Sequence, residues 1–472
     1  MKELRTFSTP QLPTIHQGKV RDSLRVDDER RLIVVTDRIS CFDKNLDTLL
    51  PNKGRILNGL SNAWFLKTQH IINNHVIDRV DPCATLVKEA QPIRVEMIVR
   101  SYLTGSIWRK YEKGVREVCG VKLPDGMKRN DPFPEPIITP TTKDVIDVDI
   151  SPEGIVEAGL VSAKLYAEMA KKSLELFEFG SELCESKGII LVDTKYEFGL
   201  LGGKLILIDE IHTPDSSRFW LKEDYEKDSS SERWMDKEFI RLWLLSERKE
   251  GREHTSLPQE IVDEAVERYS TLYQTLLGED LSKCKADVGG RLRGNLQRAG
   301  LMRDAYVAIV MASTRDQKHV EKLIKGLEKY RVAILLRIVS AHKNGEEIVS
   351  MLEEYNHSAE PGAILAVAGR SNGLGGALSA NTSLPVINCP PFQDKVDMLT
   401  NIQSSLMMPS EAPASTVIDP DNAAKMAVRS LNLQRIKSLI NDEILEVKKA
   451  LKEEDALLKK KNIGVGVEIT EG

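Results

Sequence analysis

The stretch 188–220, GIILVDTKYEFGLLGGKLILIDEIHTPDSSRFW, organises the first part of the chain. Apolar and polar residues alternate over 189–198, a turn cluster follows at 199–203, and the alternation resumes over 204–210. Alternation with a period of two residues is typical of β-strands, and a glycine-rich turn between two such runs is typical of a hairpin. The stretch therefore predicts a β-hairpin.

Acidic residues mark both strands of this hairpin. A turn centred on Leu201 puts Asp193 opposite Asp209, and side-chain alternation puts Asp193, Lys195 and Glu197 on one face. Opposed like charges destabilise a sheet, so the pattern favours a positive group between them, either a divalent metal or Lys195. Mg2+ is the natural metal, because it takes oxygen ligands and completes its shell with water and substrate phosphates. The alternative is a solvated face without chemistry.

The run 212–220 completes a recognisable pair of segments. It contains a Pro-Asp turn and Arg218, whose forked side chain suits a phosphate or carboxylate. DTKYEFG at 193–199 and IDEIHTPDSSRFW at 208–220 resemble the signature of the SAICAR synthetase family, ligases that use ATP to join aspartate to a carboxylated aminoimidazole ribonucleotide. The resemblance implies an ATP-binding α+β domain with Lys195 in catalysis. It also implies Mg2+ held by Asp193, Glu197 and Asp209.

Length and composition bound the remaining possibilities. A chain of 472 residues predicts two cores, and 41% apolar with 29% charged residues is ordinary for a globular protein. A net charge of -5 excludes a general nucleic-acid or membrane binder, because no dominant basic field exists. The six cysteines lie far apart without a C-x-x-C pair, which favours neither zinc nor disulfides. Without a signal core or membrane-length apolar run, a cytoplasmic protein is expected.

A basic hairpin is predicted near the start of the chain. IHQGKVRD at 15–22 and RLIVVTD at 31–37 read as strands joined through a Gly-Lys turn. Gly18 allows close approach of the backbone to a phosphate, and Lys19 and Arg21 supply charge, although no Walker loop is present. Residue types alone also fit a plain basic turn. The family resemblance implies that Gly18, Lys19, Val20 and Arg21, with Asp209, bind ATP and that Lys19 is catalytic.

Three further segments match the same family. They are TDRIS at 36–40, the Lys53-Gly54 turn and RSYLTGS at 100–106. A serine at a helix start beside an arginine can form an anion pocket, but it fits an N-cap beside a surface arginine equally well. The resemblance implies that the ribonucleotide is held by Asp37, Ser40, Arg100, Ser106 and Arg218.

Helices are predicted over 59–73, 157–187, 236–245 and 257–278, and an ordered proline-rich loop over 123–143. The segment DVIDVDIS is shorter than its counterpart in the family, which leaves the contribution of Asp144–Asp149 open. The first domain is expected over 1–280, followed by a linker rich in Gly, Lys and Arg over 281–304.

The pattern changes to short apolar strands over 307–311, 334–339, 364–368 and 385–388, separated by helical stretches. This order predicts a doubly wound parallel α/β domain of the flavodoxin-like kind over 305–432, followed by a helix and tail over 433–472. Polar residues fall just past the strand ends, where open parallel sheets bind ligands.

MAST, SAHK, AGRSNGLG, ANT and CPP in this half resemble the AIR carboxylase family of the type that needs neither biotin nor ATP. The resemblance implies that Ser313 and Asp316 hold the ribonucleotide and that His342 handles the proton of the imidazole carbon. It also implies that Lys343, Ser371 and Asn372 accommodate CO2. From residue types alone, His342 fits a structural role as well. The implied set is completed by Ser340, Arg370 and Gly373.

Departures from the carboxylase pattern occur at Ala312 and Ala380, where glycine is usual, and at 407–412. An extra Cβ beside a phosphate site narrows it, and loss of an arginine weakens phosphate binding. The expected function is bifunctional purine synthesis on aminoimidazole ribonucleotide, CO2 or bicarbonate, and L-aspartate, by a homo-oligomer assembled through the second domain. Two alternatives are a catalytically dead second domain that only oligomerises, and an ATP-dependent small-molecule kinase without an aspartate requirement.

Overall fold

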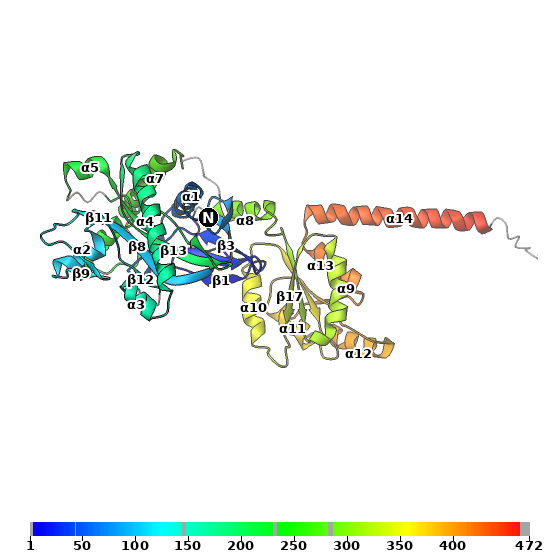
Figure 1. The fold of residues 1–472 in the computed structure, drawn as a ribbon. Helices are drawn as coiled ribbons and strands as arrows, with labels where there is room; N and C mark the ends of the chain where they lie inside the picture. The colour runs from blue at the N-terminus through cyan, green and yellow to red at the C-terminus, as the bar shows by residue number, and fades with distance from the viewer. Residues whose placement is uncertain (1–2, 43, 144–147, 230–233, 282–286, 463–472) are drawn as a thin grey trace, which may run out of the picture. The chain divides into compact units, whose positions relative to one another are not determined.

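A computed structural model describes residues 3–42, 44–143, 148–229, 234–281 and 287–462 (Figure 1). It divides into two compact units, which confirms the prediction of two cores. The first unit comprises Met1–Phe7 and Leu12–Leu301, and the second comprises Ser8–Gln11 and Met302–Gly472.

Antiparallel sheets form the first unit. A five-stranded sheet has the order β1-β2-β3-β7-β6, and a second sheet has the order β11-β8-β13-β14, with β12 on β8 and β15 on β13. The strands of the first sheet are β1 (Thr14–Gln17), β2 (Arg21–Arg25), β3 (Arg30–Val35), β6 (Val76–Asp81) and β7 (Ala84–Lys88). Those of the second are β8 (Gln91–Tyr102), β11 (Pro132–Ile138), β12 (Thr141–Thr142), β13 (Ile189–Leu201), β14 (Lys204–Ile208) and β15 (Ser217–Leu221). Two short pairs are β4 (Arg38–Cys41) with β5 (Lys44–Leu49) and β9 (Glu117–Val118) with β10 (Val121–Lys122).

The central hairpin is present, but its register differs from the prediction. Leu201 pairs with Lys204 and Glu197 with Ile208, so the turn is centred between Gly202 and Gly203. Both glycines have positive φ, which two-residue hairpin turns of type I′ require. The expectation that Asp193 faces Asp209 is therefore wrong. Asp193 instead pairs with Arg218 on β15 and with Arg100 on β8.

Several helix boundaries also differ from the prediction. The helix expected from residue 59 begins earlier, as α1 (Lys53–Lys67), and the one expected over 157–187 is two helices, α3 (Pro152–Glu157) and α4 (Ala163–Glu185). The break lies at Gly159, whose φ is +66°, and Ser162 then caps α4 by accepting from the Leu165 N–H. The remaining helices are α2 (Gly105–Glu112), α5 (Lys222–Lys227), α6 (Glu238–Lys249), α7 (Gln259–Leu277) and α8 (Val288–Arg298).

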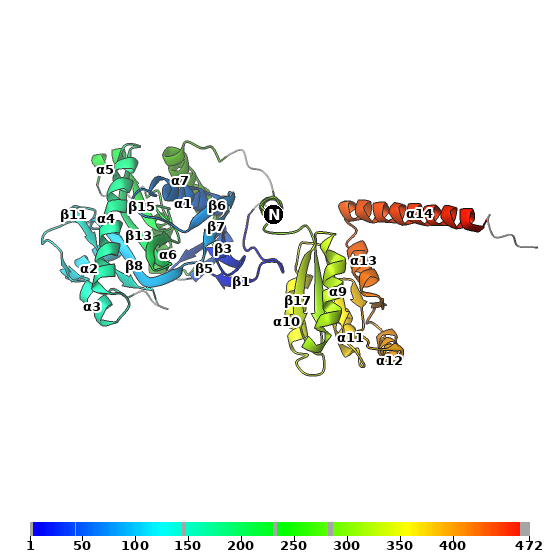
Figure 2. The ribbon, with the colours of Figure 1, turned by 45° about the vertical axis from the view of Figure 1, so that its right-hand side comes forward.

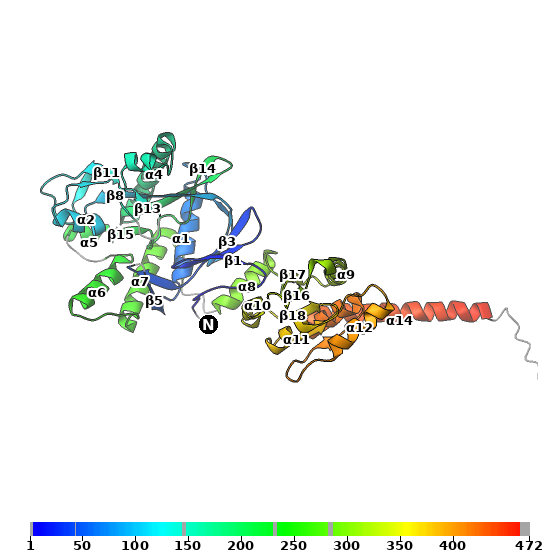
Figure 3. The same cartoon turned by 90° about the horizontal axis from the view of Figure 1, so that it is seen from below.

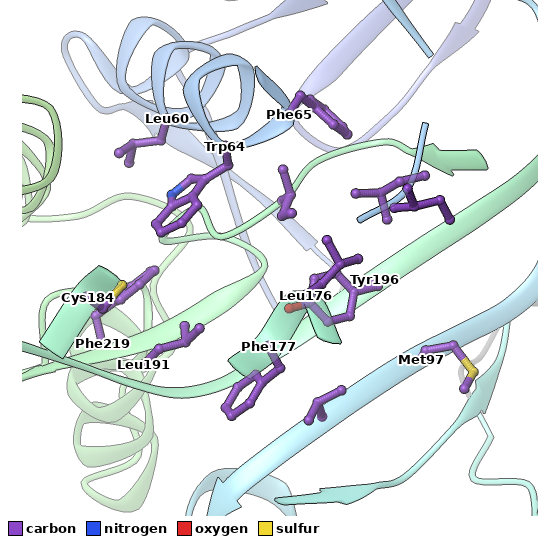
Figure 4. Packing of buried hydrophobic residues seen from close by; sticks show 14 of the residues in the cluster. Leu60, Trp64, Phe65, Met97, Leu176, Phe177, Cys184, Leu191, Tyr196 and Phe219 are labelled. Carbon is purple, nitrogen blue, oxygen red and sulfur yellow. The ribbon is translucent and has the colours of Figure 1, made fainter. Parts of the chain in front are cut away.

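The core of the first unit lies between its helices and the large sheet. Figure 4 shows side chains from α1, α4, β8, β13 and β15 packed against one another. They include Leu60 and Trp64 from α1, Leu176 and Phe177 from α4, Met97 from β8, Tyr196 from β13 and Phe219 from β15. This packing fixes β8, β13 and β15 as a rigid platform.

Two stretches without clear periodicity contain regular structure. The proline-rich loop holds β11 and β12, and α8 lies inside the predicted linker 281–304. Helix α8 is held by Arg291 and Asn295, whose side chains donate to Asp81. Residues 144–147 of the segment 144–149 lie outside the described residues, while Asp149 pairs with Lys110. The domain boundaries themselves remain a prediction.

A five-stranded parallel sheet with the order β17-β16-β18-β19-β20 forms the second unit, as predicted. Every residue of β16, YVAIVM, and of β18, GAILAV, is buried, which is typical of strands covered on both faces. The strands are β16 (Tyr306–Met311), β17 (Ala333–Ile338), β18 (Gly362–Val367), β19 (Val386–Asn388) and β20 (Ser415–Thr416).

Helices cover both faces of this sheet. Helices α9 and α13 pack on the face that contains Val307 and Leu365, and α10 and α11 pack on the face that contains Ala308 and Ile364. Figures 2 and 3 show α9 and α10 on opposite sides of the strands. The arrangement is doubly wound and flavodoxin-like. The helices are α9 (Gln317–Glu328), α10 (Glu347–Asn356), α11 (Gly373–Ala380), α12 (Lys395–Leu406), α13 (Pro420–Ser430) and α14 (Gln434–Asn462), with a 3-10 turn at Thr314–Asp316.

Among the described residues, none of the helices combines the length and the apolar content that crossing a bilayer requires.

Candidate functional site

Lys195 lies at the middle of a group of carboxylates on the large sheet of the first unit. Its Nζ is 2.9 Å from Glu96 Oε1 and 3.9 Å from Asp209 Oδ2, and it donates a short hydrogen bond to Glu197. Lys143 pairs with the other oxygen of Glu197. We call Glu96, Lys143, Lys195, Glu197 and Asp209 the lysine–carboxylate centre. The hairpin pattern predicted a positive group between Asp193 and Asp209; in the structure, Lys195 lies between Glu197 and Asp209 instead.

Lys195 and Glu197 each keep the other charged. Burial by itself would lower the pKa of the Lys195 ammonium, but Glu197, Asp209 and Glu96 raise it well above its ordinary value. Burial would raise the pKa of the Glu197 carboxyl, but Lys195 and Lys143 hold it below its ordinary value. At neutral pH, Lys195 is therefore a cation and Glu197 an anion.

The chemistry of Glu197 and Asp209 fits a magnesium ion. Both present carboxylate oxygens, the ligand type Mg2+ prefers, and the side chain of Lys143 is 43% exposed, so it is free to move away from Glu197. Asp193, the third predicted ligand, has its Oδ2 engaged by two arginines, and its role as a metal ligand stays a prediction. Within the described ranges, no group of three or more His, Cys, Asp or Glu side chains is already arranged to hold a metal.

The arginines around Asp193 and Glu238 form a second group. Asp193 Oδ2 accepts from Arg100 Nη1 at 3.1 Å and from Arg218 Nη1 at 2.6 Å. Glu238 lies 3.2 Å from Arg218 Nη2. It also lies 3.2 Å from Arg241 and 3.7 Å from Arg109. We call Arg100, Arg109, Arg218 and Arg241 the arginine cluster. Four guanidinium groups against these two carboxylates leave a positive balance, which suits a phosphate.

Gly105 permits the approach of Arg218 to this group. Its φ is +60°, and a Cβ at this position would lie 2.4 Å from Arg218 Nη2. The next residue, Ser106, lies in the first turn of α2, and its hydroxyl accepts from Arg100 Nη2 at 3.4 Å. Three of the residues predicted to bind the ribonucleotide, Arg100, Ser106 and Arg218, are thus brought together.

Arg21 connects the predicted ATP loop to the end of the hairpin. It lies at the start of β2, donates to Asp209 Oδ1 at 3.0 Å and also pairs with Glu210. Burial would lower the pKa of Arg21, but Asp209 and Glu210 raise it. A narrow cleft beside α1 is lined by these three residues together with His75, whose pKa burial lowers to about 4. The loop 18–21 is therefore tied to the lysine–carboxylate centre through Asp209.

Asp37 and Ser40 have contacts away from the arginine cluster. The carboxylate of Asp37 accepts from the backbone N–H of Leu4 at 2.7 Å and of Gly54 at 2.9 Å. Ser40 Oγ accepts from Lys237 Nζ at 3.2 Å. Asp37 therefore fixes the backbone, whereas Ser40 lies beside a buried cation whose pKa burial lowers.

Sequence reasoning left five residues of the two groups unassigned: Glu96, Lys143, Arg109, Glu238 and Arg241. Glu96 interrupts the apolar run of β8, and a charge inside a buried strand is a usable signal. Lys143 and Glu238 carry no such local mark, because their partners Glu197 and Arg218 are 54 and 20 residues away.

Strand topology gathers the predicted residues of the second unit. β16 is flanked by β17 and β18 in parallel register, with Met311 level with Ile338 and Val367. The segments that follow these three strands therefore meet at one edge of the sheet. They carry Ser313 and Asp316 after β16, Ser340, His342 and Lys343 after β17, and Arg370, Ser371, Asn372 and Gly373 after β18.

Hydrogen bonds from α12 hold the loop 370–373. The Arg370 N–H donates to Asn401 Oδ1 at 2.6 Å and the Asn372 N–H to Ser404 Oγ at 2.7 Å. The side chain of Asn372 accepts from the Gly375 N–H and so caps α11. His342 lies against this loop, because a Cβ on Gly373 would come within 2.8 Å of the imidazole Cε1. His342 and Lys343 are both exposed.

The departures at Ala380 and Met407 lie at exposed positions. Ala380 ends α11, at the opposite end of that helix from Gly373, and Met407 is 81% exposed. Ala312 is half-buried and donates its N–H to Val367 O at 2.9 Å. The Cβ of Ala380 therefore does not narrow the loop 370–373.

Comparison with known proteins gives matches for both units. The family model described as SAICAR synthetase matches residues 14–258, and the model described as AIR carboxylase matches residues 306–454. Phosphoribosylaminoimidazole-succinocarboxamide synthase of Azobacteroides pseudotrichonymphae is 42% identical over 292 residues, which cover 60% of this chain and 90% of that protein. The SAICAR synthase of Saccharomyces cerevisiae, solved in complex with SAICAR, is 37% identical over 59% of this chain and 99% of that chain, with a TM-score of 0.53. Treponema denticola PurE is 35% identical over 33% of this chain and 99% of that chain, with a TM-score of 0.31.

Proposed function

Because the chain belongs to the SAICAR synthetase family and carries an AIR carboxylase domain, it is a bifunctional enzyme of purine biosynthesis, and we propose how its residues divide the two reactions. In the first unit, ATP phosphorylates the carboxylate of the carboxylated ribonucleotide, and the amine of L-aspartate displaces the phosphate. In the second unit, CO2 is added to aminoimidazole ribonucleotide, so that the second unit makes the substrate of the first.

The placement of two complementary groups on one strand supports the ligase assignment most strongly. β13 carries both Asp193 and Lys195, two residues apart. Asp193 accepts hydrogen bonds from the arginine cluster, and Lys195 donates to the carboxylates of the lysine–carboxylate centre. The arginine cluster, with Ser106, suits the phosphate of the ribonucleotide. Lys195 then stabilises charge on the reacting carboxylate, at a fixed spacing set by the strand.

The phosphates of ATP are assigned to the loop 18–21. Lys19 supplies a cation beside the transferring phosphoryl group, and Arg21 anchors the loop on Asp209. Glu197 and Asp209 would hold Mg2+, which would supply positive charge to the phosphates. Two further pairs lie in the same unit. Lys237 donates to Ser40, and the buried Lys53 pairs with Asp215 at 2.7 Å.

In the second unit, we assign the ring proton to His342 and the developing carboxylate to Lys343 and the loop 370–373. Carboxylation creates negative charge that fixed donors stabilise, and it needs a base for the proton that leaves the ring carbon. Ser313, Asp316 and Ser340 lie at the same sheet edge and are assigned to the ribonucleotide. The contact between His342 and Gly373 supports this arrangement.

Phosphate release, measured with the carboxylated ribonucleotide and ATP, separates a ligase from a small-molecule kinase. A ligase releases phosphate mainly when L-aspartate is present, and equal release without it contradicts the proposal. Incubation with aminoimidazole ribonucleotide and bicarbonate tests the second unit. Failure to form the carboxylated product at high enzyme concentration would leave only an oligomerisation role for that unit.

We further propose that the chain assembles with copies of itself through the second unit. Helix α12 turns its polar residues Asn401 and Ser405 inward, while Val396 and Leu399 are 75% and 60% exposed. Helix α14 likewise exposes apolar side chains, among them Leu445, Val447 and Leu451, which are 62%, 59% and 58% exposed. Exposed apolar stripes of this kind are typical of subunit interfaces. A mass of 52.9 kDa in solution, that of a single chain, would contradict assembly.

The cytoplasm is the compartment that we propose. The six cysteines lie far apart in the sequence without a C-x-x-C pair, which favours a reducing compartment. Compartment-specific labelling of the full chain tests this assignment.

A further inference from the structure

Arg38 lies directly beneath the loop 18–21 in the first unit. It belongs to β4, its side chain is 7% exposed, and its guanidinium forms an ion pair with the buried carboxylate of Asp22 at 2.7 Å. The same carboxylate accepts from the Phe7 N–H at 2.9 Å. Arg38 was not among the residues that the sequence assigned to either reaction.

Every N–H of this guanidinium has a partner. Nε donates to Lys19 O at 3.1 Å, Nη2 to Gly18 O at 2.9 Å, and Nη1 to Arg5 O at 2.6 Å. The two remaining hydrogen bonds go to the oxygens of Asp22 at 2.7 and 3.4 Å. An arginine has five N–H groups, so Arg38 has none left for a substrate. Any effect that Arg38 has on the reaction must act through the groups that it holds, which are the loop 18–21, Arg5 and Asp22.

The hydrogen bonds to two successive carbonyls fix the orientation of the loop backbone. In a trans peptide, the C=O of one residue and the N–H of the next point in opposite directions. When Gly18 O and Lys19 O point to Arg38, the N–H groups of Lys19 and Val20 point the other way. Thr36 extends this control, because its N–H and Oγ1 both donate to Val20 O, at 2.9 and 2.8 Å. Successive N–H groups held in one direction form an anion-binding concavity.

We propose that Arg38 is a positioning residue for nucleotide binding, which sets the loop 18–21 so that its N–H groups and Lys19 meet the phosphates of ATP. This inference rests on the proposed assignment of ATP to that loop. The guanidinium fork is required, because a lysine at this position keeps the charge but cannot hold two carbonyls and a carboxylate in one plane.

The test uses the full chain with Arg38→Lys, and Arg30→Lys as the matched control. Arg30 lies on β3, the strand that precedes β4 in the chain, and forms an exposed ion pair with Asp27. In Arg38→Lys, we expect the KM for ATP to rise about tenfold, since the loss of hydrogen bonds from a charged group weakens the loop. The KM for aspartate is expected to stay within about twofold. Tryptophan fluorescence serves as the control for folding, because all five tryptophans lie in the first unit with Arg38.

A second variant and a hydrogen-exchange measurement also test whether Arg38 positions the loop 18–21. Thr36→Val removes one hydrogen bond to Val20 O without changing shape, and it should raise the KM for ATP about threefold. Hydrogen exchange over residues 16–25 should become faster in Arg38→Lys and stay unchanged in Arg30→Lys. Equal rises in the KM values of all three substrates, or an unchanged KM for ATP, would overturn the positioning role.

Failure of the ligase assignment can be told apart from failure of the role proposed for Arg38. If the wild-type chain releases phosphate without aspartate, the ligase assignment fails, whereas the exchange experiment still reports on the loop. Titration calorimetry with ADP alone then decides the role of Arg38. Weaker ADP binding in Arg38→Lys supports it, and unchanged ADP binding overturns it.

Discussion

Lys195 in the first unit lies among three carboxylates with 27% of its side chain exposed, whereas His342 in the second unit is exposed and lies against Gly373. The first site is a network of opposite charges, and the second is a set of loops held by backbone and amide hydrogen bonds. The ligands proposed for the two sites also differ in charge. ATP carries several charges that a preassembled network can stabilise, while CO2 is neutral until it reacts. Residues of the first site should therefore support both stability and activity, and His342 activity alone.

The largest effect is expected for Lys195→Met. Removal of the ammonium leaves Glu96, Glu197 and Asp209 without their shared counter-charge. We expect ligation to fall on the order of 10³-fold. The first unit should lose about 2 kcal/mol of unfolding free energy, less than for a fully buried pair because the side chain is partly exposed. Activity assays and denaturant unfolding measure the two effects.

Lys204→Met is the matched control, because Lys204 lies exposed at the start of β14 in the same hairpin. Loss of ligation without loss of stability in Lys195→Met would contradict a structural role for the network. All five tryptophans lie in the first unit, so their fluorescence reports the unfolding of that unit alone.

The second largest effect is expected for His342→Asn. Removal of a general base typically costs 10²–10⁴-fold, so carboxylation should fall about 10³-fold. The melting temperature should stay the same, since His342 is exposed. His357→Asn, at the exposed C-terminal end of α10, is the control and should leave the rate unchanged. A large loss of stability in His342→Asn would remove the contrast between the two sites.

A smaller effect is expected for Gly105→Ala. The added Cβ meets the guanidinium of Arg218 at 2.4 Å and displaces it from the arginine cluster. We expect the KM for the ribonucleotide to rise about tenfold, while the KM for ATP changes little. Gly114→Ala is the control, because Gly114 also has positive φ, at +90°, but a Cβ there has no neighbour within 4 Å. Equal KM values for the two variants would mean that backbone strain alone is responsible.

The smallest effect at neutral pH comes from a buried histidine, because its contribution to stability changes only as the pH falls. Burial lowers the pKa of His212 to about 3, and its Nε2 lies 2.6 Å from the hydroxyl of Tyr196. The unfolded chain takes up a proton below about pH 6.5 that the folded chain does not, so stability is lost as pH falls from about 6.5 toward 3. His212 alone contributes a slope that approaches about 1.4 kcal/mol per pH unit, and His75, whose pKa burial lowers to about 4, adds to it above that pH. In His212→Gln, the unfolding free energy, followed by tryptophan fluorescence, should fall less steeply with decreasing pH. An unchanged slope would mean that other groups cause the loss of stability in acid.

The sequence by itself determined the two families, the two fold classes and most of the candidate residues. These features are local, because alternation, turn residues and motifs such as DTKYEFG or SAHK are encoded within a few positions. The parallel order of the second unit also placed His342 and the loop 370–373 at one edge, since strand ends meet wherever strands run parallel. The tertiary structure decided the charge pairing.

Only the tertiary structure shows that Lys195 lies between Glu197 and Asp209, that Asp193 belongs to Arg100 and Arg218, and that Arg38 holds the loop 18–21. The physical reason is that partners such as Arg100 and Asp193 are 93 residues apart in the chain. Whether Asp193 faces Asp209 across the hairpin depends on the position of the turn. The turn lies at Gly202 and Gly203, and this register is not fixed by composition or periodicity.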